Sequence, residues 1–95
     1  MDILNWLCNW YKKNCNGDWE HNYGVAIGTL DNPGWSVKID LVDTPLYGKK
    51  LEKRWIENSD SDWCSVSSDG IFFEAYGDSS KLRFMLEYFK EFVEE

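Results

Sequence analysis

The side chains best suited to chemistry lie close together between residues 15 and 21. Asp18, Glu20 and His21 could supply a general acid, a base and an orienting group, and Cys15 could act as a nucleophile. In an extended chain, however, Glu20 and His21 point in opposite directions, and no serine or cysteine stands in a recognised nucleophile setting. A small hydrolase or transferase that uses Cys15 or Glu20 with His21 is therefore the alternative hypothesis, and we expect a protein that is not an enzyme.

The sequence as a whole predicts neither a metal site nor a cofactor. A single histidine and three scattered cysteines match no zinc-binding pattern. The segments DNPG and NSDSD lack the alternating oxygen ligands, the glycine and the final glutamate of an EF-hand calcium loop. Gly24, Gly28 and Gly34 do not mark a turn from a strand into a helix, which a phosphate-binding loop requires.

The chain is acidic, with 17 Asp and Glu residues against 10 Lys and Arg and a formal charge of −7. This balance argues against binding to nucleic acid or to an anionic membrane through a broad basic surface. It favours a basic protein as the partner, although acidic groups also serve simply to keep proteins soluble. The six Trp, five Tyr and five Phe residues are more aromatic groups than one small core needs, so we expect some at the surface as binding anchors.

The cysteines and the lack of long apolar segments predict a cytoplasmic protein. Cys8, Cys15 and Cys64 form no CxxC pair, and their odd number argues against a complete set of disulfides. The first residues lack the apolar run and cleavage pattern of a signal peptide. No apolar run approaches the roughly 20 residues of a membrane-spanning helix.

Hydrophobic periodicity predicts a helix near each end of the chain. Residues 3–14 carry apolar side chains at three- and four-residue spacing, and Asp2 precedes them as a cap. A second helix, with apolar positions from 82 to 93, follows Asp78, which we expect to cap it. Two ion pairs at four-residue spacing should support this second helix, Arg83 with Glu87 and Lys90 with Glu94.

Alternation with a period of two predicts the strands between these helices. Residues 23–30 and 35–41 form a hairpin around Asn32-Pro33-Gly34-Trp35, which fits a type II turn with Gly34 at positive φ. Residues 49–57 alternate weakly, as expected for an exposed edge strand protected by lysines. A second hairpin joins residues 63–66 to 71–76 through Ser67-Ser68-Asp69-Gly70.

This order of elements predicts an α+β fold in a single domain, residues 1–95. We expect an N-terminal helix, a sheet of four or five mainly antiparallel strands built of hairpins, and a C-terminal helix packed on the sheet. The helices should cover one face of the sheet.

Longer motifs in the chain resemble the immunity protein 53 family of bacterial polymorphic toxin systems. The specific elements are GDWEH at residues 17–21 and LDNPGW at residues 30–35, and the likeness extends over nearly the whole chain. The family often has an acid after the first cysteine of this stretch, where this chain has Asn16, so one charge is missing from the expected surface.

The resemblance implies a cytoplasmic antidote, encoded beside a toxin, that binds the toxin domain and blocks it. The partner is then a basic protein, and the expected toxin-binding residues are Asp18, Trp19, Glu20, His21, Asp31 and Trp35. For both tryptophans a structural role is an equal alternative. A third hypothesis is a scaffold or small-ligand module, which would need a concave apolar site of at least about 300 Å³.

Overall fold

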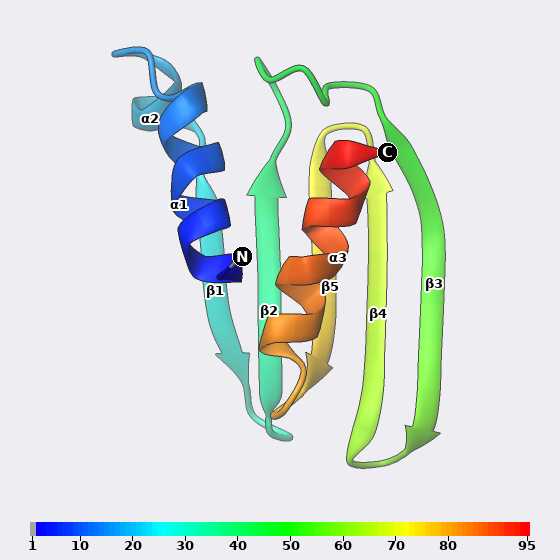
Figure 1. Cartoon of the computed structure of the whole chain (residues 1–95). Helices are drawn as coiled ribbons and strands as arrows, with labels where there is room; N and C mark the ends of the chain where they lie inside the picture. Colours follow the sequence, from blue (N-terminus) through cyan, green and yellow to red (C-terminus); the bar gives the residue numbers. More distant parts are fainter. Residues whose placement is uncertain (1) are drawn as a thin grey trace.

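The computed structural model describes residues 2–95, which form a five-stranded sheet and three helices (Figure 1). In chain order the elements are α1 (Ile3–Asn14), α2 (Trp19–Asn22), β1 (Val25–Leu30), β2 (Gly34–Asp40), β3 (Lys50–Ser59), β4 (Asp62–Asp69), β5 (Phe72–Asp78) and α3 (Leu82–Glu94). The strand order is β1-β2-β5-β4-β3, and every neighbouring pair is antiparallel. The predicted α+β fold is confirmed.

Helix α1 begins and ends where its sequence predicts. The Asp2 carboxylate accepts a hydrogen bond from the backbone N–H of Leu4 at 3.1 Å, which satisfies one of the free donors at the helix start. Lys12 and Lys13 lie in the last turn, where the helix dipole favours positive charge. The buried face carries Ile3, Leu7 and Trp10.

The first hairpin forms as predicted, but its turn does not. Gly34 is the first residue of β2 and pairs with Leu30, and its φ lies outside the positive region, so the type II turn centred on Pro33 and Gly34 is wrong. A Cβ atom on Gly34 would collide with the carbonyl oxygen of Gly77 on β5. Position 34 requires glycine because β2 and β5 approach each other closely there. The turn between β1 and β2 is made by residues 31–33.

The remaining strands follow the predicted hairpins. β3 lies at one edge of the sheet, as expected, and its pairing with β4 shifts register twice. Such irregularities, together with the lysines of β3, protect an edge from pairing with other chains. The turn between β4 and β5 contains Gly70 at φ 92°, the positive value that an Asp-Gly turn requires.

The core lies between the sheet and the two long helices, which Figure 1 shows on the same face. Helix α3 contacts β5, β2 and β4, and α1 packs against α3. The centre is aromatic. Phe89 of α3 lies 5.0 Å from both Trp10 of α1 and Phe73 of β5, measured between ring centroids, so one side chain joins the two long helices to the sheet.

The start of α3 differs from its prediction. Asp78 is the last residue of β5 and does not cap the helix; Lys81 stands at the cap position, without a capping side chain. The buried Asp78 carboxylate instead accepts hydrogen bonds from the backbone N–H of Trp63 at 2.8 Å and from the hydroxyl of Ser80 at 2.6 Å. It also pairs with the Lys81 ammonium at 2.9 Å. Asp78 therefore ties β4, β5 and α3 together.

One of the two expected ion pairs on α3 is present. Lys90 and Glu94 lie 3.2 Å apart, whereas Arg83 and Glu87 form no ion pair in the part of the chain that the structure describes. Within residues 2–95 no helix has both the length and the apolar character needed to span a membrane.

The register of the sheet assigns residues to its two faces. Arg54, Val66, Ala75 and Val37 form one row across four strands, and the Arg54 guanidinium donates to the Tyr88 hydroxyl of α3 at 2.8 Å, so this row faces the helices. The next row, Trp55, Ser65, Tyr76 and Ser36, must face the opposite way. This second face carries no helix, and we call it the open face.

Candidate functional site

The segment between α1 and β1 is held by its own side chains. The Glu20 carboxylate accepts hydrogen bonds from the backbone N–H groups of Asn16 and Gly17, both at 2.9 Å. The Asn16 side chain accepts from the N–H groups of Asp18 and Trp19 at 3.0 and 2.9 Å. Asn16 thus satisfies the free donors at the start of the four-residue helix α2. These bonds give residues 16–20 a defined shape.

Hydrogen bonding also sets the charge of Glu20. Backbone N–H groups, its own first and those of Asn16 and Gly17 after it, lower the pKa of the Glu20 carboxyl below its usual value because they stabilise the ionised form. Asp18 and His21 are exposed beside it. The segment therefore presents fixed negative charge next to the single histidine.

Trp19 is a core residue. Its side chain is 2% exposed, and its indole nitrogen donates to the carbonyl oxygen of Val42 at 2.9 Å. Its ring lies 6.1 Å from that of Trp10 and 5.9 Å from that of Tyr11. Trp19 attaches α2 to the core and so positions Asp18, Glu20 and His21 from beneath.

The other two expected residues lie at the opposite end of β1. Asp31 is exposed in the turn between β1 and β2, and Figure 1 shows this turn far from α2. A six-residue strand separates the two groups, a span of about 20 Å. Trp35 is half-buried and donates from its indole nitrogen to the carbonyl oxygen of Ser79 at 3.0 Å. The six expected residues are thus divided between two ends of the molecule.

The side chains named for catalysis have other partners. The Cys15 thiol donates to the Tyr11 carbonyl oxygen at 3.3 Å, and both Glu20 oxygens accept from backbone N–H groups. No group of three or more His, Cys, Asp and Glu side chains within residues 2–95 is arranged to hold a metal ion. All three cysteines are free, and burial raises the pKa of the Cys64 thiol to about 11.

An apolar hollow of about 430 Å³ lies between α1 and the start of β1. Its lining consists of Leu7, Cys8, Tyr11, Tyr23, Gly24 and Val25. Tyr11 and Tyr23 also contact the Trp19 ring, so the hollow adjoins the segment that carries Asp18 and His21. It is an open groove rather than an enclosed cavity, a shape that suits a side chain of another protein better than an engulfed small molecule.

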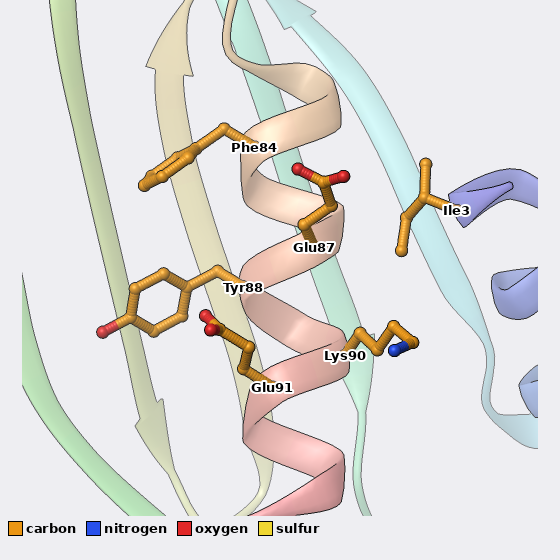
Figure 2. Close-up of a pocket in the computed structure, with 6 residues that line it drawn as sticks. All are labelled: Ile3, Phe84, Glu87, Tyr88, Lys90 and Glu91. Carbon is orange, nitrogen blue, oxygen red and sulfur yellow. The ribbon is translucent and has the colours of Figure 1, made fainter. Parts of the chain in front are cut away.

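A second hollow of about 430 Å³ crosses the outer side of α3. Figure 2 shows Phe84 and Tyr88 projecting to one side of the helix and Lys90 to the other, with the Glu87 and Glu91 carboxylates between them. The labelled side chains spread outward and do not converge on one point. This arrangement does not provide the mutual hydrogen bonds that acid–base or nucleophilic catalysis needs.

Comparison with protein-family models matches residues 4–94 to the family described as Immunity protein 53. The chain belongs to this family. Neither the curated proteins nor the solved structures compared with the chain gave a match. The match includes both ends of β1, so family membership alone does not decide which end is the functional surface. One end carries residues 16–22, which we call the α2 segment, and the other carries the β1–β2 turn.

The structure of this immunity protein 53 family member also exposes aromatic residues that the sequence reasoning did not single out. Trp55 on β3 is 53% exposed, and Trp63 on β4 stacks against it with the ring centroids 5.7 Å apart. Both lie on the open face. Turn position alone could not have found the pair, because a regular hairpin centred on residues 60 and 61 places Trp55 and Trp63 on opposite faces. The register shift between Glu57 and Ser59 brings them onto one face.

Proposed function

We propose that this protein is a cytoplasmic immunity protein that binds the toxin encoded beside it and blocks that toxin without catalysing a reaction. Family membership is the observation that carries this proposal. The formal charge of −7 supports it, because many toxins that attack nucleic acids carry basic clefts that an acidic protein can cover.

The α2 segment is the proposed contact surface. Asp18 and His21 are exposed, and Glu20 is held in its ionised form, so this segment offers polar contacts of defined geometry. The neighbouring apolar groove can take an apolar side chain of the toxin. Trp19 acts from the core by fixing the segment. Asp31 and Trp35 belong to a second contact region at the other end of β1.

Electrostatic attraction gives this proposal a kinetic consequence. Complementary charge raises association rates to about 10⁸–10⁹ M⁻¹s⁻¹ at low salt, against about 10⁵–10⁶ M⁻¹s⁻¹ without it. We expect the association rate with the toxin to fall steeply as salt is added, because ions screen the attraction.

Calorimetry with the product of the adjacent toxin gene tests the proposal. We expect a stoichiometric complex, and we expect co-expression to rescue cells that produce the toxin. The D18N/H21A double variant should bind about tenfold more weakly, as removal of well-placed contacts does. E52Q is the matched control, because Glu52 is exposed on β3 and its change alters net charge equally.

Two outcomes would contradict different parts of the proposal. If the wild-type protein forms no complex and gives no rescue, the proposed function is wrong. If D18N/H21A and E52Q bind as well as the wild type, the function stands and the toxin contacts another surface.

A further inference from the structure

A groove on the open face carries features that the α2 segment lacks. It measures about 370 Å³ and is lined by Asn32, Trp55, Glu57, Asp60 and Trp63. Asn32 comes from the β1–β2 turn and Asp60 from the β3–β4 turn, and Figure 1 shows both turns at the same end of the sheet. The groove therefore lies at the end that also holds Asp31.

Two stacked indoles form the apolar part of this groove. The Trp55 and Trp63 rings are inclined by only 21°. Although Ser65 belongs to the row that faces away from the helices, its exposure is only 3%. Side chains of the open face must therefore cover it, and Trp55 stands directly opposite it on β3. A large aromatic surface left open in this way, with a polar rim, is typical of a binding site.

The charged residues that line the groove all have one sign. The lining includes two carboxylates and no basic residue. The indole nitrogen of Trp55 donates to the Glu57 carboxylate at 3.1 Å, which holds one negative charge against the ring edge. Asp60 is exposed at the tip of the hairpin. This lining favours an occupant that is positively charged and can lie on an aromatic surface.

The chain's own cations already use aromatic rings of this face. The Lys53 ammonium lies 5.4 Å from the centre of the Trp55 ring, and the Lys38 ammonium lies 4.1 Å from that of Phe72. These are cation–π distances. Neither lysine lines the groove, so its acidic side stays free for a cation from another molecule.

We infer that this groove receives an arginine side chain of the toxin, stacked on the Trp55–Trp63 pair and bonded to Glu57 and Asp60. Arginine fits better than lysine, because a planar guanidinium can stack on an indole while it donates hydrogen bonds to carboxylates in its plane. The inference rests on the proposed function. It adds a contact on β3 and β4, at the end of the sheet opposite to the α2 segment.

Calorimetry with the adjacent toxin gene's product tests the groove through two variants, W55A and E57Q/D60N. We expect each to weaken binding about tenfold or more, as removal of an anchor or its ion partners does. Y47A controls for the loss of an exposed aromatic side chain, because Tyr47 is 63% exposed in the β2–β3 connection. E52Q controls for the loss of one negative charge outside the groove, because Glu52 is exposed on β3. Both controls should bind within about threefold of the wild type. Urea unfolding of each variant confirms that it is folded.

A second measurement tests directly whether the groove prefers a positively charged side chain. The indole N–H resonances of Trp55 and Trp63, assigned with W55A and W63A, are followed by NMR during titration with N-acetylarginine amide. We expect larger shifts than with N-acetylglutamine amide at equal concentration, and we expect the difference to disappear in E57Q/D60N. Equal shifts with both compounds would overturn the assignment of the groove to a cation.

The outcomes separate this inference from the proposed function. Undiminished toxin binding by both W55A and E57Q/D60N would overturn the inference and leave the function standing. No binding by the wild type would overturn both. Weaker toxin binding by W55A and E57Q/D60N, with binding by Y47A and E52Q unchanged, would support the groove as a toxin contact.

Discussion

The two faces of the sheet use the same residue types in opposite ways. On the helix side, Trp10, Trp19, Phe73 and Phe89 are buried and contact one another. On the open face, Trp55 remains 53% exposed, although it too is stacked on another tryptophan. Burial of aromatic area stabilises the fold, whereas aromatic area left in water is available to a partner. The high aromatic content of the chain therefore serves two purposes that substitutions can separate.

The largest effect is expected at Trp19. The W19A variant removes a fully buried indole and its hydrogen bond to Val42, so the free energy of unfolding should fall by roughly 3–5 kcal/mol. Urea unfolding of the variant and the wild type measures this change. A loss below about 1 kcal/mol would mean that Trp19 does not anchor α2.

A smaller effect is expected at Asp78, which joins the end of β5 to α3. Replacing its buried carboxylate in D78N weakens the bonds from Ser80, Trp63 and Lys81, so we expect a loss of roughly 2 kcal/mol at neutral pH. Urea unfolding measures it. An unchanged free energy of unfolding would contradict the role of Asp78 as a link between β4, β5 and α3.

The effect of D78N should also depend on pH. Hydrogen bonds, first from the Ser80 hydroxyl and then from backbone N–H groups and Lys81, hold the pKa of the Asp78 carboxyl far below its usual value. As pH falls, the Asp78 carboxyl is therefore protonated in the unfolded chain before it is protonated in the folded protein. The stabilisation that ionised Asp78 gives the fold declines below about pH 4. The difference between the wild type and D78N should narrow over the same range, and D60N, at an exposed acid, provides the control.

The smallest effect on stability is expected on the open face. Because Trp55 is half in water, W55A should reduce the free energy of unfolding by about 1 kcal/mol or less, the scale of an exposed aromatic pair. The same urea experiment measures it. A loss as large as that of W19A would show that the two faces do not differ in this way, and that the open indoles belong to the core.

Local patterns predicted most of the elements, because each depends on neighbouring residues. The spacing of apolar side chains defined α1 and α3, and the turn residues between alternating segments defined the hairpins. The predictions were wrong where a residue distant in the sequence determines the local structure. Gly34 is required by the carbonyl of Gly77, and Asp78 is occupied by Trp63, Ser80 and Lys81. The insertion of β5 between β2 and β4 is a long-range pairing of the same kind.

The candidate site was predicted less completely than the fold. The sequence indicated an acidic, aromatic segment, but it did not show that Trp19 turns inward, which depends on how α1 and α2 pack on the core. The separation of Asp18, Glu20 and His21 from Asp31 follows from the strand predicted over residues 23–30, although all of them were expected in one binding surface. The groove at Trp55 and Trp63 needed the register of two strands whose pairing contains shifts.

The buried thiol of Cys64 lies on the face of the sheet that the helices cover, so its labelling reports separation of the helices from the sheet. Alkylating reagents attack the thiolate, which scarcely forms at neutral pH in that environment, and the side chain is 1% exposed. Cys8, by contrast, is exposed to the same reagent. The rate at which Cys64 is alkylated, relative to Cys8 in the same sample, therefore measures how often the structure around Cys64 opens.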